Sequence, residues 1–132
     1  MAKITSIIED QAYKVVLTSE TGNTLIADEP QSLGGQDLGF SPKELLAASL
    51  AACTSATLKM YAGRKEWDLQ QVKISVELDY DSSAHKTTIK RDLEFVGDLD
   101  TKQKDRLLQI ANRCPVHKML ENTVHIDTQY KN

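Results

Sequence analysis

The chain has 132 residues, of which 40% are hydrophobic and 27% are charged, and its net charge is −3. This length and composition predict one globular domain, residues 1–132, with enough apolar side chains for a core. No basic run or aromatic–basic interleaving occurs, so we expect no nucleic acid partner. The N-terminus carries no apolar leader and no window approaches the apolar length of a membrane span. We therefore expect a cytoplasmic protein that contacts no membrane.

Strands are predicted within residues 3–28. Tyr13, Val15 and Leu17 alternate with more polar neighbours, and a turn at residues 21–23 precedes a short apolar run. Residues 29–39 contain one proline and three glycines, which predicts a loop. A phosphate-binding loop is the alternative, but no Gly-Lys-Ser/Thr sequence follows, so a mobile loop is favoured.

A long helix is predicted at residues 42–62. Ser41 is a favourable N-cap, Pro42 suits the first helical position, and Glu44 completes a capping box. Gly63 is a typical residue just beyond a helix C-terminus. Small residues flank the apolar face of this helix, so we expect it to be central and largely buried. The residues of that face are Leu46, Leu50, Cys53, Thr57 and Met60.

A long antiparallel hairpin is predicted after this helix. Apolar residues alternate through residues 72–80, a turn follows at residues 82–84, and a second alternating run covers residues 89–95. Arg91 falls in the apolar register of the second strand. We interpret it as an arginine near the end of the sheet, with its stem packed and its head in water.

A second helix is predicted to open at Asp100, where Gln103 completes another capping box. Its pattern stops at Cys114, because the residue before a proline is pushed out of the α region. Pro115 then begins a short helix with Cys114 as its N-cap, and a last strand is predicted at residues 124–130. This order predicts an α+β fold, with a mainly antiparallel sheet packed on two long helices.

The two cysteines, Cys53 and Cys114, each lie on an apolar helical face, so their thiols can meet if the helices pack together. The start of a helix at Cys114 favours the thiolate. A thiolate can attack a peroxide and become a sulfenic acid, which a second thiol converts to a disulfide. Spacing alone does not tell which cysteine attacks first. The alternatives are two unrelated core cysteines, or a metal site that includes His117 but lacks the four local ligands of structural zinc. We expect no metal, and we interpret His117 as a surface residue of the short helix.

Two sequence motifs carry a resemblance to a known family. They are SPKELLAASLAACTSATLKMYA at residues 41–62 and ANRCPVHKML at residues 111–120. Together they resemble the OsmC/Ohr family of thiol peroxidases, as do the strand order and the glycine pair before the long helix. The resemblance implies an OsmC-like fold and an intertwined homodimer with active sites at the subunit interface. It also implies that Cys53 is the peroxidatic and Cys114 the resolving cysteine. Organic hydroperoxides would be the substrates, a thiol such as dihydrolipoamide the reductant, and no cofactor would be needed.

The chain departs from the well-studied branches of that family at two activating residues. Those branches carry a glutamate directly after the proline of the long helix and an arginine in the N-terminal strands. Here Lys43 follows the proline, and residues 1–63 contain no arginine. The first candidate for the missing cation is Arg91, and the second is Lys43, which lies about 80° from Cys53 around the helix. A redox sensor or a module that binds an apolar small molecule, built on the same fold, is the alternative to a peroxidase.

Overall fold

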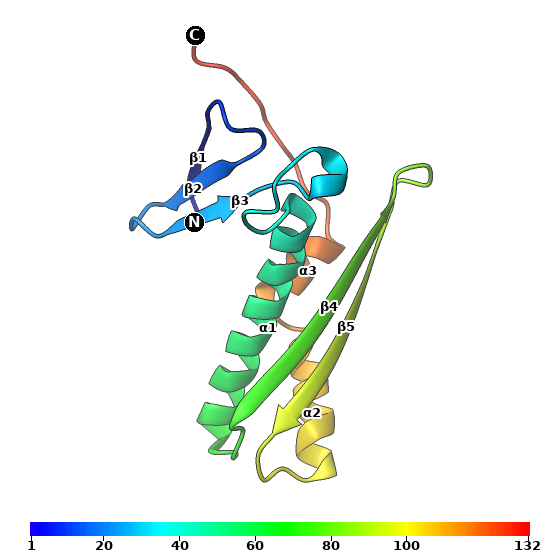
Figure 1. Cartoon of the computed structure of the whole chain (residues 1–132). Coiled ribbons are helices and arrows are strands. Elements are labelled where there is room, and N and C mark those ends of the chain that lie inside the picture. The colour runs from blue at the N-terminus through cyan, green and yellow to red at the C-terminus, as the bar shows by residue number, and fades with distance from the viewer. The chain divides into compact units, whose positions relative to one another are not determined.

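The computed structural model describes residues 1–132, which divide into two compact units at residues 1–47 and 48–132. Each unit contains its own antiparallel sheet, of three strands in the first unit and two in the second (Figure 1). The α+β class is as expected. That residues 1–132 act as a single domain stays a prediction.

The first unit is a three-stranded sheet followed by a loop. Its strands are β1 (Ile4–Ile8), β2 (Val15–Ser19) and β3 (Thr24–Ala27), in the order β1-β2-β3. In the turn between β2 and β3, Gly22 has a φ of +92°, which glycine adopts without a Cβ clash. The predicted strands and turn are therefore confirmed. The loop at residues 29–39 is confirmed as well, and it contains only a short 3₁₀ turn at Gln31–Leu33.

Asp28 ties the segments around this sheet together. Its side chain lies at the end of β3 and is nearly buried, with 2% of its surface exposed. Its carboxylate oxygens accept four backbone N–H bonds at 2.8–3.2 Å, which come from Tyr13, Glu29, Gln36 and Leu38. Burial raises the pKa of this carboxyl, but the four donors outweigh burial and lower it below its ordinary value. The ionised carboxylate thus fixes both the loop before β2 and the loop after β3.

The long helix α1 (Pro42–Lys65) begins where the sequence predicts. Ser41 Oγ accepts the backbone N–H of Glu44 at 3.2 Å, and the Glu44 carboxylate accepts the N–H of Ser41 at 2.9 Å, so the capping box is confirmed. The predicted end at residue 62 is wrong, because the helix continues through Gly63. The chain leaves the helix at Glu66, which has a φ of +56°, and the helix closes with a bond from the N–H of Trp67 to the carbonyl of Ala62.

The buried side of α1 is narrower than predicted. Its buried residues are four apart, at Leu50, Thr54, Leu58 and Ala62. The predicted face is wrong at its ends, and Met60 is 64% exposed. Small side chains such as that of Ala62 make the close contacts with neighbouring elements, whereas the prediction followed the larger apolar residues. The helix is therefore buried along one stripe within the chain and is not largely buried.

The apolar content of α1 also corrects one expectation about membranes. Its most apolar 18-residue window has a mean hydropathy of 1.2, so by length and composition alone the helix could cross a membrane. The expectation that no window approaches the apolar length of a membrane span was wrong. The many alanines of α1 raise the mean hydropathy of the window without adding large side chains. The same helix also supplies Leu58 and Ala62 to the core of the second unit.

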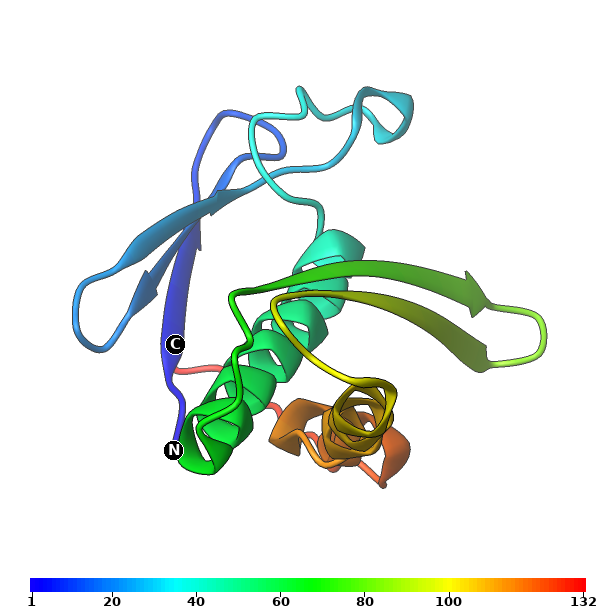
Figure 2. The same cartoon turned by 90° about the horizontal axis from the view of Figure 1, so that it is seen from below.

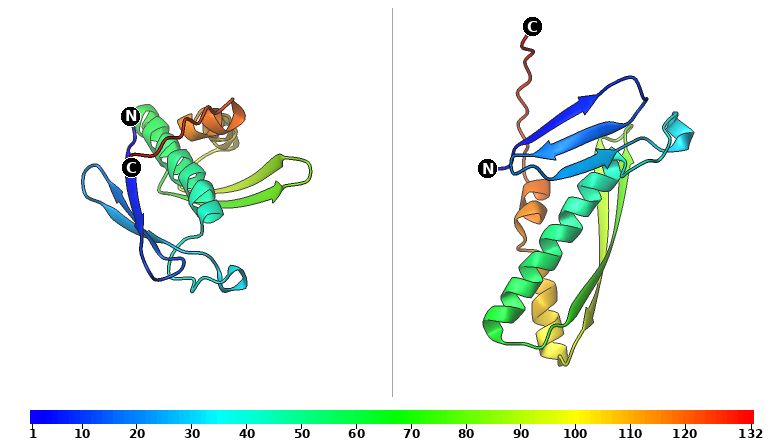
Figure 3. Two further views of the ribbon diagram at one scale, coloured as in Figure 1. Left: turned by 90° about the horizontal axis from the view of Figure 1, so that it is seen from above. Right: turned by 60° about the vertical axis from the view of Figure 1, so that its left-hand side comes forward.

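The second unit packs helices on one face of a long hairpin. Strands β4 (Gln71–Asp81) and β5 (Lys86–Val96) pair antiparallel, with Val76 opposite Arg91. Figures 2 and 3 show α1 and α2 (Thr101–Ala111) on the same side of this hairpin, whose turn extends beyond the helices. The predicted hairpin is confirmed, and so is the capping box at the start of α2. The expectation of two long helices is not met, because α2 has 11 residues and α1 has 24.

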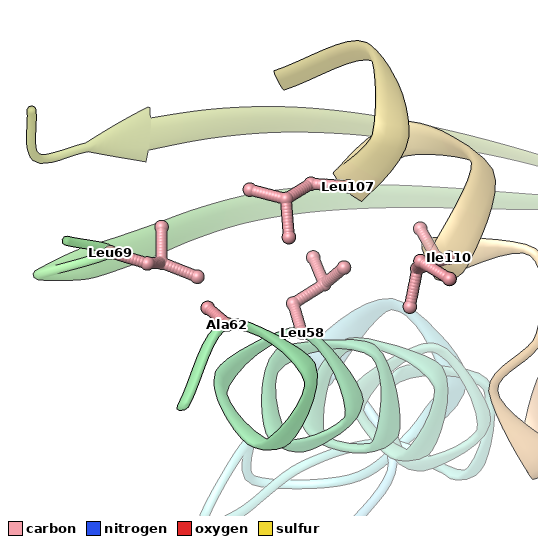
Figure 4. Packing of buried hydrophobic residues seen from close by; sticks show 6 residues of the cluster. Leu58, Ala62, Leu69, Leu107 and Ile110 are labelled. Carbon is pink, nitrogen blue, oxygen red and sulfur yellow. The ribbon is translucent and has the colours of Figure 1, made fainter. Parts of the chain in front are cut away.

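The core of this unit lies between α1 and α2 (Figure 4). Leucine, isoleucine and alanine side chains from the two helices and from the segment before β4 meet there. The members are Leu58, Ala62, Leu69, Leu107, Ile110 and Ala111. Half-buried side chains of the hairpin, including Val72, Leu93 and Phe95, cover this cluster from the sheet side. The apolar alternation of the two strands therefore has the expected function of covering a core.

The C-terminal segment does not form the predicted strand. After the short helix α3 (Pro115–Glu121), residues 123–132 form neither helix nor strand. Val124, Ile126 and Tyr130 are 67%, 79% and 85% exposed. An alternating pattern makes a strand only where a neighbouring strand accepts its hydrogen bonds, and within the chain no strand pairs with this segment.

Candidate functional site

Cys114 lies at the break between α2 and α3. The proline after it ends the first helical path and begins the next, so Cys114 takes an extended conformation and becomes the N-cap of α3, as predicted. Its side chain is completely buried. Its Sγ accepts the backbone N–H of His117 at 3.3 Å. The Cys-Pro sequence thus places the sulfur of Cys114 in the interior of the second unit, next to the backbone N–H of His117.

Helix α1 brings two neighbouring residues to this sulfur. Thr54 is completely buried, and its Oγ1 lies 3.7 Å from Cys114 Sγ. The Cys53 side chain, which is half-buried, is also close enough to help lower the pKa of Cys114. Both cysteines are free thiols. Although far apart in the sequence, the two predicted site residues therefore lie close together.

Arg91 reaches the same place from the middle of β5. Its Nη1 donates to Thr54 Oγ1 at 2.9 Å, and its Nη2 donates to Asn112 Oδ1 at 3.0 Å. The same nitrogen lies 3.1 Å from His117 Nδ1. The interpretation of Arg91 as a residue at the sheet end with its head in water was wrong. The inward register of β5 faces the helices, where three side chains, none of them a carboxylate, receive the guanidinium.

His117 links this arginine to the surface, so its interpretation as a surface residue was wrong as well. A guanidinium only donates hydrogen bonds, so His117 Nδ1 must accept the bond from Arg91. The ring hydrogen is then on Nε2, which lies 3.0 Å from the Glu121 carboxylate and donates to it. The result is a continuous hydrogen-bonded chain from Glu121 through His117 and Arg91 to Thr54.

The surroundings of Cys114 favour the thiolate. Burial raises the pKa of this thiol, because it penalises the charged form. Hydrogen bonds from the His117 N–H, Thr54 and Cys53, together with the positive charge of Arg91, outweigh burial and lower the pKa below its ordinary value. The site therefore holds a buried sulfur prepared to carry negative charge.

A cavity of about 290 Å³ adjoins the network. One part of its wall is apolar and another carries Arg91 and His117, which also belong to the network around Cys114. The lining residues are Leu50, Thr87, Ile89, Arg91, His117, Leu120 and Glu121. Such a cavity can hold a small molecule with an apolar body and a polar end. Nowhere in residues 1–132 do three His, Cys, Asp or Glu side chains gather as a metal site.

Comparisons with known proteins agree with these features. Residues 34–129 match the family described as OsmC-like protein. The chain belongs to this family. The resemblance predicted from its two cysteine motifs is thus confirmed. The comparison with curated protein sequences gave no match.

Solved structures support the same fold for this OsmC-like protein. It is 26% identical to the organic hydroperoxide resistance protein OhrB of Bacillus subtilis, with a TM-score of 0.62 and coverage of 90% of this chain and 89% of that one. It is 25% identical to a candidate osmotic stress induced and detoxification response protein from Psychrobacter arcticus, with a TM-score of 0.76 and coverages of 89% and 85%. An OsmC-like protein from Mycoplasma pneumoniae, 20% identical with a TM-score of 0.79 and coverages of 92% and 87%, supports the fold alone.

Two residues of the OsmC-like site were missed in the sequence. Thr54 follows Cys53 directly, and Asn112 lies two positions before Cys114, so both are inside the motifs that carry the family resemblance. Proximity to the cysteines was the available signal. Of the two cations proposed to replace the missing arginine, Arg91 reaches the site, where its positive charge helps to lower the pKa of Cys114. Lys43 is an exposed residue of the first turn of α1.

Proposed function

We propose that this OsmC-like protein is a cysteine-based thiol peroxidase that reduces organic hydroperoxides through a Cys53–Cys114 disulfide. The observation that carries the proposal is the proximity of these two thiols, together with the lowered pKa of Cys114, the proposed resolving cysteine. Similarity to an organic hydroperoxide resistance protein supports the substrate class. We further propose that the protein acts in the cytoplasm as a homodimer.

The reaction needs two chemical steps on the protein. Cys53 attacks one peroxide oxygen, the O–O bond breaks, an alcohol leaves, and Cys53 becomes a sulfenic acid. The Cys114 thiolate then attacks the Cys53 sulfur, and the departing hydroxide takes a proton to become water. Two thiols and one hydroperoxide thus yield a disulfide, an alcohol and water. The family resemblance supplies these roles, with Cys53 peroxidatic and Cys114 resolving.

The cavity next to the network supports an organic substrate. Leu50, Ile89 and Leu120 form its apolar wall. An alkyl group gains about 25 cal/mol for each Å² that it buries there, and hydrogen peroxide has no apolar surface to bury. We therefore expect tert-butyl and cumene hydroperoxide to react faster than hydrogen peroxide. A thiol such as dihydrolipoamide would return the disulfide to its reduced form.

Mass spectrometry after a stoichiometric dose of cumene hydroperoxide tests this function. The reduced protein should form an intramolecular Cys53–Cys114 disulfide and consume the peroxide. Cys53→Ser should abolish consumption, and Cys114→Ser should accumulate a sulfenic acid or a more oxidised Cys53. If Cys114→Ser blocks the first oxidation and Cys53→Ser does not, the two roles are reversed. If neither cysteine changes mass with excess hydroperoxide, the protein is not a peroxidase.

A further inference from the structure

The two sulfurs of the site differ in exposure and in hydrogen bonding. We infer that Thr54 and Arg91 hold Cys114 as the leaving thiolate when the disulfide is reduced, so that the reducing thiol attacks the sulfur of Cys53. This inference rests on the Cys53–Cys114 disulfide of the proposed function. It assigns Thr54 and Arg91 as positioning residues, and it fixes where the reductant is joined to the protein.

Access is the first argument for attack at Cys53. Cys114 has no exposed surface, and its sulfur lies against Thr54 of α1 and the first turn of α3. Cys53 is half-buried and has some exposed surface on α1. A second copy of the chain can only cover more surface, so it would leave Cys114 enclosed. An incoming thiol therefore meets the sulfur of Cys53 first.

The leaving sulfur is the second argument. In thiol–disulfide exchange, the sulfur that better carries negative charge leaves faster. Cys114 receives a hydrogen bond from the backbone N–H of His117, which stays in place when the disulfide forms and breaks. The charged and titratable groups around it are Cys53 on α1, Arg91 on β5 and His117 on α3. Arg91 is the cation among them, and none of its three hydrogen-bond partners is a carboxylate.

Thr54 adapts to the charge of Cys114 because a hydroxyl has one hydrogen and two acceptor sites. With a neutral Cys114 thiol, the hydroxyl donates to the Leu50 carbonyl at 2.7 Å and accepts from both Arg91 and the thiol. With a Cys114 thiolate, the hydroxyl turns and donates to the sulfur while it still accepts from Arg91. The Arg91 N–H polarises the hydroxyl in both cases and strengthens it as a donor. Thr54 therefore transmits the charge of Arg91 to the leaving sulfur.

The reduction step balances with one thiol of the reductant. Its thiolate attacks Cys53 Sγ, a new S–S bond forms, and the Cys53–Cys114 bond breaks. The bonding electron pair moves to Cys114 Sγ, which leaves as the thiolate. A second thiol of the reductant then attacks the reductant sulfur of the mixed disulfide. The reductant thereby forms its own disulfide, and Cys53 leaves as a thiolate that takes up a proton.

The position of the mixed disulfide tests the inference independently of peroxide chemistry. The Cys53–Cys114 disulfide is formed with diamide, treated briefly with β-mercaptoethanol, and quenched with iodoacetamide before peptide mapping. We expect the mercaptoethanol adduct on Cys53 and the alkyl group on Cys114. An adduct on Cys114, or failure of diamide to join the two cysteines, overturns the inference. Failure of hydroperoxide to form a disulfide that diamide does form contradicts only the proposed function.

Variants of the two positioning residues supply the second test. The pKa of Cys114 is measured by ultraviolet thiolate absorbance in a Cys53→Ser background, and the rate of disulfide reduction is measured with both cysteines present. Thr54→Val should raise this pKa and slow reduction, because a leaving sulfur with a higher pKa departs more slowly. Thr54→Ser, which keeps the hydroxyl, should restore both, and Thr57→Val on the same helix is the matched control.

Arg91 is tested in the same way. Arg91→Met should raise the pKa of Cys114 and slow reduction, and Arg91→Lys should recover part of both effects. Arg113→Met removes the same charge at an exposed position beside Cys114 in the sequence and is the matched control. If Thr54→Val and Arg91→Met leave the pKa of Cys114 unchanged, these residues do not hold the thiolate and the inference fails.

Discussion

Arg91 interrupts an otherwise apolar strand, and its surroundings explain how the fold tolerates it. A half-buried charge loses part of its water, and this is costly unless hydrogen bonds replace that water. Thr54, Asn112 and His117 supply these bonds from three different helical segments or their ends. One side chain thereby connects α1, the end of α2 and α3 to the hairpin. An arginine at this position thus has both a structural and a chemical role.

Cys114 should make the stability of the reduced protein depend on pH. Its pKa is lowered in the folded state, so the folded protein loses this proton at a lower pH than the unfolded chain does. The stabilisation from the thiolate is therefore complete above the ordinary cysteine pKa and is lost as the pH falls through the lowered one. We expect the difference in unfolding free energy between reduced wild type and Cys114→Ser to grow as the pH rises through this window. Urea unfolding at several pH values measures it, and a constant difference would contradict the lowered pKa.

Asp28 should stabilise the first unit in its ionised form. Asp28→Asn replaces one carboxylate oxygen with an NH₂ group. That group cannot accept the backbone N–H bonds that the oxygen accepts, so these N–H groups lose their partner. We expect a loss of stability at neutral pH, measured by urea unfolding. Because the folded pKa of Asp28 is lowered, its contribution is present above the ordinary aspartate pKa and is lost as the pH falls through the lowered value. The gap between wild type and variant should therefore shrink in acid, and exposed Asp10→Asn is the control.

At the scale of the element, the end of α1 shows how a local rule can mislead. Gly63 suits a position just beyond a helix, but it lies inside the last turn. Glu66 adopts the left-handed conformation instead, although its side chain makes this conformation less favourable than it is for glycine. The helix thus continues past Gly63, the residue most suited to end it. The turn that follows leads to Trp67, which packs against the core, and to Leu69, which belongs to it.

Gly63→Ala should stabilise the protein. A Cβ at this position meets no atom within 4 Å, and the residue lies in a helix, where glycine costs about 0.5–1 kcal/mol relative to alanine. We expect an increase of that size in the unfolding free energy from urea denaturation. Gly97→Ala is the opposite control, because its Cβ would overlap the backbone oxygen of Asp68. A destabilised Gly63→Ala variant would show that other atoms cover this position in solution.

The capping box at Asp100 should fix the start of α2. The Asp100 carboxylate accepts the N–H of Gln103 at 2.7 Å, and the Gln103 side chain accepts the N–H of Asp100 at 2.9 Å. Asp100→Ala should therefore cost about 1 kcal/mol of unfolding free energy. Asp100→Ser keeps an acceptor at the cap and should retain most of the stability. Equal losses in both variants would indicate that the cap is not the source of the effect.

At the scale of the whole molecule, the chain exposes much apolar surface. The exposed side chains come from β1, α1 and the C-terminal segment. They include Ile4, Ile7, Ile8, Met60, Val124, Ile126 and Tyr130. Single exposed apolar residues are ordinary, but several of them along one segment, as in β1 and in the C-terminal segment, indicate a surface that binds another protein. The intertwined homodimer implied by the family resemblance would give these surfaces a partner.

We therefore expect an obligate homodimer. Sedimentation at low micromolar concentration should give a dimer with no folded monomer, because the exposed face of α1 would otherwise remain in water. Met60→Glu places a charge on this face and should weaken the dimer, whereas Lys73→Glu on a polar position of β4 should not. A stable folded monomer of the wild type would contradict the expectation.

Local rules of the chain were sufficient for most elements. The capping residues at Ser41 and Asp100, the period-two alternation of β4 and β5, and the Cys-Pro break at Cys114 each act within a few residues, so the sequence alone determined them. The same motifs identified the family and the two cysteines. The end of α1 and its buried face were predicted wrongly, because both depend on the elements that pack against the helix.

Only the tertiary structure decided what surrounds the cysteines and whether the last segment forms a strand. The contacts of Arg91 with Thr54, Asn112 and His117 join residues that are far apart in the chain, and no local pattern encodes them. The alternation in residues 124–130 is local, but a strand also requires a neighbour to accept its hydrogen bonds. The lowered pKa belongs to Cys114 for the same reason, since its donors and its cation come from three elements that only folding brings together.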